Sequence, residues 1–228
     1  MITYYREALM LCHPGHPDRF SSLDSLANAV LARYKQLGRP NDLEEVITYY
    51  REALALCPPG HEARWSSLNN LASEVLTRYD HSGRREDLEE VITYLRESLT
   101  LCPPGHPGHA VSLNNLATVV FTRYEKWGGM EDLEEAITYH REALTLRPPG
   151  HPSRSASLGK FASAVHARYE RLGRMEDLEE AITYHREALT LHLPGHPNRS
   201  TSVNNLANAV LTCYKQSGRM EDLEEAIT

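Results

Sequence analysis

The sequence repeats itself every 45 residues along its whole length, and this period constrains the fold more than any other feature. The segment EDLEEAITYHREALTLRPPGH at 131–151 returns at 176–196 with few changes, and looser copies occupy 41–61 and 86–106. One isoleucine marks the period without drift: Ile2, Ile47, Ile92, Ile137, Ile182 and Ile227. Self-similarity at a fixed spacing of this size is typical of a solenoid, in which each unit packs mainly on its neighbours.

The apolar pattern within one period predicts two helices, which we call A and B. In 61–105, helix A is expected from Trp65 to His81, and Gly83 is expected to end it because glycine tolerates a left-handed conformation. One face of this helix carries apolar residues at intervals of three and four: Leu68, Leu71, Ala72, Val75 and Tyr79. Helix B is expected to begin at Asp87, as the first residue of a capping box, and to end before Pro103.

The predicted fold is all-α, a solenoid of stacked antiparallel helix pairs that forms a single array over 1–228. Its expected units are a partial repeat at 1–15, full repeats at 16–60, 61–105, 106–150 and 151–195, and a partial repeat at 196–228. Both ends cut through a repeat, so we expect a fragment of a longer array. Apolar faces exposed at such ends would favour end-to-end self-association.

The composition argues against several kinds of partner and compartment. A net charge of −7 disfavours binding to nucleic acid or to an anionic membrane surface. No run of 18 apolar residues predicts a membrane span, and the N-terminus does not resemble a signal peptide. Cys12, Cys57 and Cys102 share one repeat position, and stacked repeats would hold them too far apart for disulfides. We therefore expect reduced thiols and a cytoplasmic protein.

Each unit carries Leu-x-x-Leu-Ala or a close variant in helix A, glycine at the turn, Ala-Leu or a variant in helix B and a closing proline. This pattern resembles the tetratricopeptide repeat (TPR), whose standard unit has 34 residues. The longer unit is more similar to the extended repeats of kinesin light chains, which share His-Pro, a spacer and Leu-Asn-Asn-Leu-Ala. Here His106-Pro107 precedes that motif at 113–117. The resemblance covers the whole chain and implies a right-handed superhelix, with helices A lining a concave groove for an extended or helical peptide.

The same resemblance implies a set of peptide-binding residues. In kinesin-light-chain-like repeats the paired asparagines bind the peptide backbone, which suits an amide because it both donates and accepts. The matching positions are Asn69, Asn70, Asn114, Asn115, Asn204 and Asn205. Repeat 16–60 departs with Asp24-Ser25, and repeat 151–195 departs with Gly159-Lys160, of which Lys160 is kept in the predicted binding set. One turn further along the same face lie Asn28, Ser73, Thr118, Ser163 and Asn208. Alternatively, the asparagines tie neighbouring helices together or face water.

The other recurring polar residues are interpreted as structural. A chaperone-type carboxylate clamp needs several basic side chains, and only Lys160 lies near a matching position. The loop histidines would lie too far apart to share a zinc ion: His16, His61, His106, His151 and His196. The glutamate pairs that begin helices B favour the positive end of the helix dipole. Four arginines are expected to pack their stems over the core with their charges in water, or else to form a basic strip: Arg33, Arg78, Arg123 and Arg168.

The sequence therefore predicts a non-catalytic interaction scaffold that uses no cofactor or metal and binds a protein or peptide. It contains no phosphate-binding glycine loop and no arrangement of a nucleophile with a base. The alternative is the regulatory or sensor region of a larger signalling protein, because similar arrays are found fused to nucleotide-switch ATPase or caspase-like protease modules.

Overall fold

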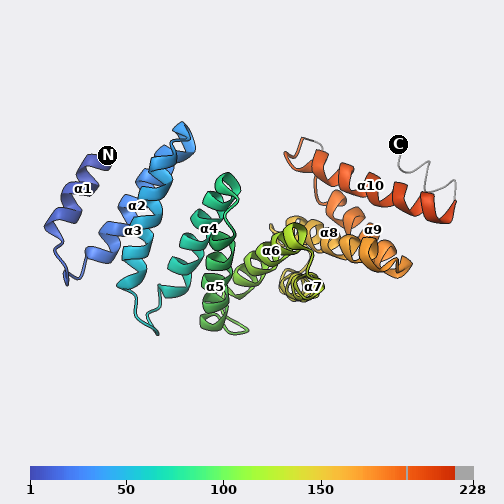
Figure 1. Cartoon of the computed structure of the whole chain (residues 1–228), viewed down its shortest axis with the longest axis horizontal. Helices are drawn as coiled ribbons and strands as arrows, with labels where there is room; N and C mark the ends of the chain where they lie inside the picture. The colour runs from blue at the N-terminus through green and yellow to red at the C-terminus, as the bar shows by residue number, and fades with distance from the viewer. Residues whose placement is uncertain (194, 219–228) are drawn as a thin grey trace. The chain divides into compact units, whose positions relative to one another are not determined.

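The structure of the protein, a computed structural model, describes residues 1–193 and 195–218 (Figure 1). This part of the chain folds into α-helices without strands, and none of these helices is long and apolar enough to cross a membrane. The helices are α1 (Ile2–Leu11), α2 (Arg19–Leu37), α3 (Pro40–Ala55), α4 (Arg64–Ser82), α5 (Arg85–Leu101), α6 (His109–Trp127), α7 (Met130–Thr145), α8 (Arg154–Leu172), α9 (Met175–Thr190) and α10 (Arg199–Ser217). Even-numbered helices are the predicted helices A, and each begins 45 residues after the one before.

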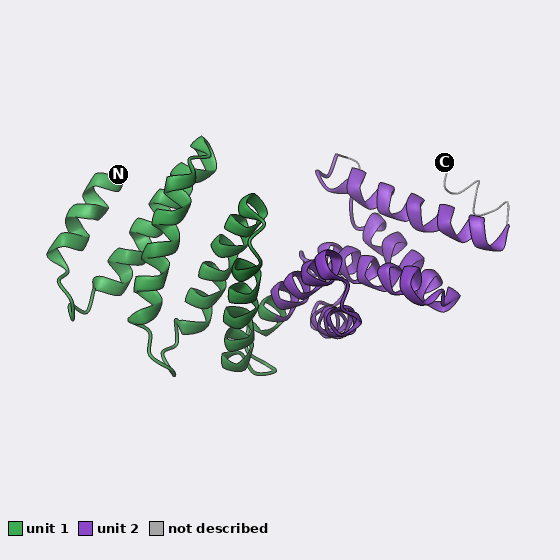
Figure 2. Ribbon diagram, in the orientation of Figure 1, with its two compact units in different colours: residues 1–112 green, residues 113–228 purple. Residues whose placement is uncertain are grey.

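The chain forms two compact units, unit 1 at 1–112 and unit 2 at 113–228, with the boundary inside α6 (Figure 2). In unit 1, each helix from α1 to α4 packs on the next helix of the chain. In unit 2, α7, α8, α9 and α10 pack in the same sequential way, and α8 also contacts α10 directly. Helices A of successive repeats are therefore neighbours in unit 2, which is where a groove between them can form.

The turn between helix A and helix B follows the predicted glycine. In repeat 61–105, Gly83 has φ +65° and its N–H bonds the carbonyl of Tyr79 at 2.7 Å. Helix A of this repeat extends one residue beyond the predicted bounds at each end. A glycine with positive φ follows every described helix A, which confirms this part of the prediction.

The predicted capping box at Asp87 is wrong. Helix α5 begins at Arg85, and its N-cap Arg84 makes no side-chain capping bond. The Asp87 carboxylate accepts two hydrogen bonds from Arg78 of the preceding helix, with Nη2–Oδ1 at 2.7 Å and Nε–Oδ2 at 3.2 Å. An aspartate in the first turn of a helix can cap the helix or bind a side chain across the turn. Here both carboxylate oxygens of Asp87 accept hydrogen bonds from the Arg78 guanidinium.

An equivalent arginine–aspartate pair with two hydrogen bonds joins helices A and B in the other three full repeats. The prediction that these arginines hold their charges in water is therefore wrong. The pairs are Arg33–Asp42, Arg78–Asp87, Arg123–Asp132 and Arg168–Asp177. The Arg78 side chain is 14% exposed and that of Asp87 is 5% exposed. Because each guanidinium is paired with an aspartate carboxylate, the four arginines do not form the alternative basic strip.

Small residues allow the helices to approach closely, as Ala117 of α6 illustrates. Its side chain is fully buried, and leucine would have to displace well-packed neighbours. We expect Ala117→Leu to lower the free energy of unfolding by about 1–3 kcal/mol, measured by urea denaturation. Val111 of the same helix is exposed, so Val111→Leu serves as the control and should change stability little. Equal stability of the two variants would remove Ala117 from the tightly packed core.

Candidate functional site

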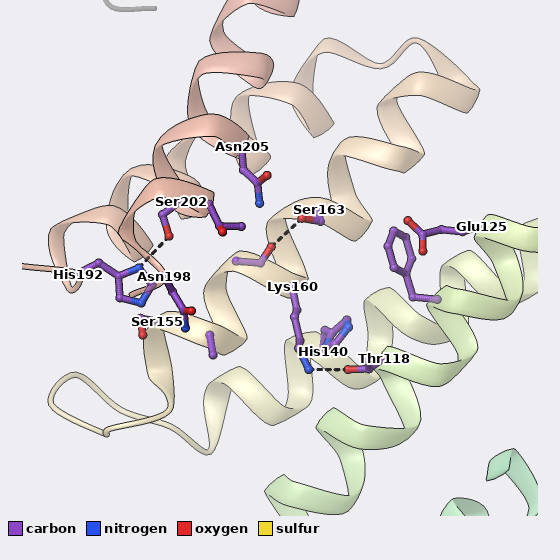
Figure 3. A pocket seen from close by; sticks show the side chains of 14 residues that line it. Thr118, Glu125, His140, Ser155, Lys160, Ser163, His192, Asn198, Ser202 and Asn205 are labelled. Carbon is purple, nitrogen blue, oxygen red and sulfur yellow. Dashed lines mark hydrogen bonds between the residues drawn. The ribbon is translucent and has the colours of Figure 1, made fainter. Parts of the chain in front are cut away.

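A cavity of about 350 Å³ lies in unit 2 between three successive helices A, namely α6, α8 and α10 (Figure 3). Helix α6 contributes Thr118, helix α8 contributes Lys160 and Ser163, and helix α10 contributes Asn205. His140 of α7 also lines this cavity. All five side chains are shown in Figure 3 around the same hollow.

A second hollow of about 430 Å³ adjoins the first. The two share Phe121, Glu125, Ser163 and Asn205 in their lining. The second hollow adds several charged or polar side chains: His166, Glu170, His185, Asn208, Thr212 and Lys215. We call the two hollows together the A-groove. It is lined mainly by the faces that helices A of unit 2 turn toward one another.

Several of the predicted binding residues in unit 2 meet at the A-groove. Its lining includes Thr118, Lys160, Ser163, Asn205 and Asn208. The other asparagines of unit 2 lie outside this lining. Asn204 is exposed, Asn115 is half-buried, and Asn114 is half-buried and accepts a hydrogen bond from Arg147 at 3.4 Å.

The predicted residues of unit 1 lie in different environments from one another. Asn70 and Ser73 are exposed on α4. Asn69 is half-buried, and its amide donates to the carbonyl of Trp65 at 2.8 Å and to the hydroxyl of Ser98 at 2.5 Å. The tying of neighbouring helices, which the sequence left open, therefore occurs at Asn69.

Asn28 is the fourth predicted residue of this unit. Its amide nitrogen donates to Asp24 within the same helix, and its amide oxygen accepts from the Tyr50 hydroxyl at 3.1 Å. The side chain is nevertheless exposed. The Asn28 side chain therefore makes hydrogen bonds within the protein while it remains exposed to solvent.

The end of the A-groove near Lys160 has a positive electrostatic environment. The Lys160 ammonium donates to the Thr118 hydroxyl at 2.9 Å. His140 is only 1% exposed, and its Nδ1 has no hydrogen-bond partner among the described residues. Burial lowers the pKa of His140 to about 3, and the positive charges of Lys160 and Arg147 act in the same direction. Burial also lowers the pKa of Lys160, with Arg147 as the second cause.

Arg147 stands at the repeat position of Cys12, Cys57 and Cys102 and is 6% exposed. Its guanidinium donates to the Ser157 hydroxyl and to the Asn114 amide oxygen. Burial lowers its pKa from the ordinary value. A charged side chain has thus replaced a small thiol in the core beside the A-groove.

Sequence reasoning missed His140 and Arg147, although a signal for both was present. When the repeats are aligned, the position of His140 is occupied by Tyr50 and Leu95 in unit 1, and the position of Arg147 is occupied by cysteines. A comparison of the repeats at these two positions would have singled out both residues.

The loop histidines have a structural role, as the sequence predicted. The Nδ1 atom of each accepts the backbone N–H two residues later, at 3.0–3.2 Å: His16, His61, His106, His151 and His196. Across the described residues, no three histidine, cysteine, aspartate or glutamate side chains are arranged as metal ligands. The four cysteines are free thiols and buried.

Solved structures with the same arrangement of helices are TPR-like repeat proteins. One contains nearly identical TPR-like repeats attributed to a Podosopora anserina kinesin light chain, with 23% identity, a TM-score of 0.60, and coverage of 93% of this chain and 95% of the other. BtubC from P. vanneervenii is 20% identical with a TM-score of 0.58, and the match covers 99% of this chain and 84% of BtubC. A MamA double mutant is 12% identical with a TM-score of 0.57, over 88% and 92% of the two chains.

The fold is a TPR-like helical repeat. The all-α repeat architecture expected from the 45-residue period is thereby confirmed. No protein-family model and no curated protein matches the sequence. At these identities the solved structures establish the TPR-like fold alone, so function has to be argued from the A-groove itself.

Proposed function

We propose that the protein is a non-catalytic TPR-like scaffold that binds a peptide segment of a partner protein in the A-groove. The observation that carries this proposal is the continuity of the two hollows along α6, α8 and α10. A hollow shared by successive repeats suits an extended chain, which can contact several helices in turn.

The side chains of the A-groove suit the recognition of a peptide backbone. Asn205 and Asn208 offer amides that both donate and accept, and Thr118 and Ser163 offer hydroxyl groups. Phe121 adds an apolar surface between the two hollows. In the proposal, Asn70, Asn115 and Asn204 extend the contact surface along the remaining helices A.

Gly159 gives a direct test, because it lines the A-groove and a Cβ at this position would meet no atom within 4 Å. Gly159→Tyr should fill the hollow without disturbing the core. Gly159→Ala is the matched control, since it leaves the hollow open and should stabilise α8 by about 0.5–1 kcal/mol. Asparagine occupies the equivalent position in three other repeats, so side chains are compatible with helix A here.

The measurement is quantitative affinity capture from cells with all three proteins, followed by calorimetric titration of the purified partner. We expect Gly159→Tyr to weaken binding at least about tenfold, as for the loss of a well-packed contact region, and Gly159→Ala to bind normally. Equal affinity of the tyrosine variant, at unchanged helical content, would exclude the A-groove as the binding site.

The alternative, a regulatory or sensor region of a larger signalling protein, stays a prediction from the sequence. The described residues contain no feature that favours it over the scaffold.

A further inference from the structure

Two glutamates and two histidines line the second hollow of the A-groove, which has a volume of about 430 Å³. Glu125 lies on α6, His166 and Glu170 lie on α8, and His185 lies on α9. We call these four side chains the acceptor cluster. Glu125 also lines the first hollow, and Figure 3 shows it on the side of that hollow away from His192.

The two histidines bring hydrogen-bonding groups that the shared packing of the repeats does not use. The Nε2 atom of His166 is buried and has no hydrogen-bond partner among the described residues. The His185 ring is 2% exposed and forms no side-chain hydrogen bond with another described residue. Buried polar groups are normally hydrogen-bonded, so these rings offer acceptors to a donor that enters the hollow. The other repeats have apolar residues at the position of His166: Leu31, Leu76, Phe121 and Leu211.

Both histidine rings are neutral at pH 7. Burial lowers the pKa of His185 to about 4, with the charge of His166 as the second cause. Burial also lowers the pKa of His166, while the carboxylate of Glu170 acts in the opposite direction. These mutual effects place His166 near both His185 and Glu170. A neutral imidazole keeps one nitrogen as a hydrogen-bond acceptor.

The charge balance of the second hollow is negative. Glu125 and Glu170 are exposed, and neither carboxylate forms a side-chain hydrogen bond or ion pair with another described residue. Lys215 of α10 is the lysine in this lining, which contains no arginine among its described residues, and it forms no ion pair with them. Lys160 lines the first hollow and not the second. Two carboxylates therefore face a single ammonium group.

We propose that the second hollow binds a cationic side chain of the partner peptide, with Glu125 and Glu170 pairing with its charge and His185 accepting one of its N–H groups. The inference rests on the proposed function, because the cation arrives on the bound segment. A guanidinium offers five donors and an ammonium offers three, so either satisfies several acceptors at once. Hydrogen bonds to carboxylates from such cations are among the stronger polar contacts in proteins.

A cation with N–H donors suits the acceptor cluster better than a metal ion does. In the part of the chain that the structure describes, no three histidine, cysteine, aspartate or glutamate side chains are arranged as metal ligands. Hydrogen bonds through several N–H groups span a wider site than the short bonds around a metal ion.

The test uses small probes, so that it does not depend on the identity of the partner. Ethylguanidinium, n-butylammonium and neutral N-ethylurea are titrated at pH 7 and constant ionic strength into the isotopically labelled full chain. NMR follows the ring signals of His166 and His185. We expect saturating shifts with the cations and at least about tenfold weaker binding of N-ethylurea, because the neutral probe lacks the charge-assisted hydrogen bonds.

Three substitutions give effects of different sign. Glu170→Gln should weaken cation binding about tenfold, as for one lost charge-assisted hydrogen bond. Lys215→Gln should strengthen it about two- to threefold, because a like charge leaves the lining. Glu179→Gln is the matched control, since Glu179 is exposed on α9 outside the lining and its substitution should leave the affinity unchanged. Opposite signs at Glu170 and Lys215 separate recognition of charge from a structural effect of the substitutions.

The outcomes separate the kind of cation from the existence of the site. A response to ethylguanidinium alone assigns an arginine side chain, a response to n-butylammonium alone assigns a lysine, and a response to both supports the cationic class as stated. Absent shifts, equal binding of N-ethylurea, or an unchanged affinity in Glu170→Gln would overturn the inference. So would zinc that binds at His166 and His185 when neither organic cation does.

Failure of this site and failure of the proposed function are distinguishable. If the probes do not bind but Gly159→Tyr still weakens partner binding, the cation site fails while the proposed function stands. If the probes bind but Gly159→Tyr binds the partner normally, the hollow is a cation site and the peptide proposal fails.

Discussion

Lowering the pH from 7 to about 4.5 is expected to unfold unit 2 while unit 1 keeps its helices. The cause is a pair of histidines at equivalent positions of α7 and α9. His140 and His185 are 1% and 2% exposed. Burial is the main reason that the pKa of His140 falls to about 3 and that of His185 to about 4. The remaining contributions also oppose protonation, from Lys160 and Arg147 at His140 and from His166 at His185.

The direction of the pH dependence follows from the lowered pKa values. Histidine in an unfolded chain has a pKa of about 6.5, so the unfolded state binds more protons below that pH. The stability that the neutral histidines allow is fully present above about pH 6.5 and is lost as the pH falls toward the folded-state values. At about pH 4.5 the two residues together remove roughly 5 kcal/mol, at about 1.4 kcal/mol for each pH unit and residue. This loss is comparable with the entire stability of many small domains.

Unit 1 supplies the matched control, because Tyr50 and Leu95 occupy the equivalent positions. The double variant His140→Leu/His185→Leu should keep its helical circular dichroism at a pH where the unsubstituted chain has lost part of it. Hydrogen exchange should place the early loss within 113–218. The aspartates paired with arginine occur in both units, so they do not explain a loss confined to unit 2. An identical acid transition in the double variant would contradict the assignment to these histidines.

The period, helix type and turn positions could be predicted because each follows from a local rule. Apolar residues at intervals of three and four place α4 to within one residue of its bounds at each end. Gly83 ends that helix because the left-handed conformation with φ +65° suits glycine. These features need only neighbouring residues, and the repeat gives several examples of each.

Contacts across the hairpin were harder to predict from the sequence. Asp87 satisfies the local pattern of a capping residue, yet it lies nine residues from Arg78 and binds it across the turn. The choice between the two roles depends on how helices A and B pack, which a local motif does not encode. Asn69 is a similar case, because its half-buried amide donates a hydrogen bond from α4 to Ser98 of α5.

The A-groove itself was partly foreseeable. Thr118, Asn205 and Asn208 were placed on one face by their positions in helix A, and they line the groove. His140 and Arg147 come from the chain segment between α6 and α8, and a motif based on helix A omits them. His140 of α7 lines the groove and Arg147 of the following loop lies beside it, which follows only from the packing of α7 against α8.

Arg78→Ala is expected to destabilise the protein strongly, because Arg78 belongs to a buried ion pair. It leaves the Asp87 carboxylate, 5% exposed, with Ser82 as its remaining side-chain donor at 3.1 Å. Removal of one partner of a buried ion pair typically costs about 3–5 kcal/mol, because the other charge stays buried without compensation. Urea denaturation followed by circular dichroism gives the value. Arg51→Ala is the control, since Arg51 pairs with Glu90 while 43% exposed and should contribute about 0–1 kcal/mol.

Comparing the loss of stability in Asp87→Ala with that in Arg78→Ala distinguishes a buried ion pair from a surface contact. In Asp87→Ala, Arg78 retains Glu44 at 3.2 Å and Glu90 at 3.4 Å, so its charge stays paired. Asp87→Ala should therefore destabilise the protein less than Arg78→Ala. Arg78→Lys should fall between the two, because an ammonium keeps the charge but cannot bind both carboxylate oxygens as a planar guanidinium does. If Asp87→Ala instead costs as much as Arg78→Ala, the burial of Asp87 does not determine the effect, and the pair contributes chiefly through the shape of the helix hairpin.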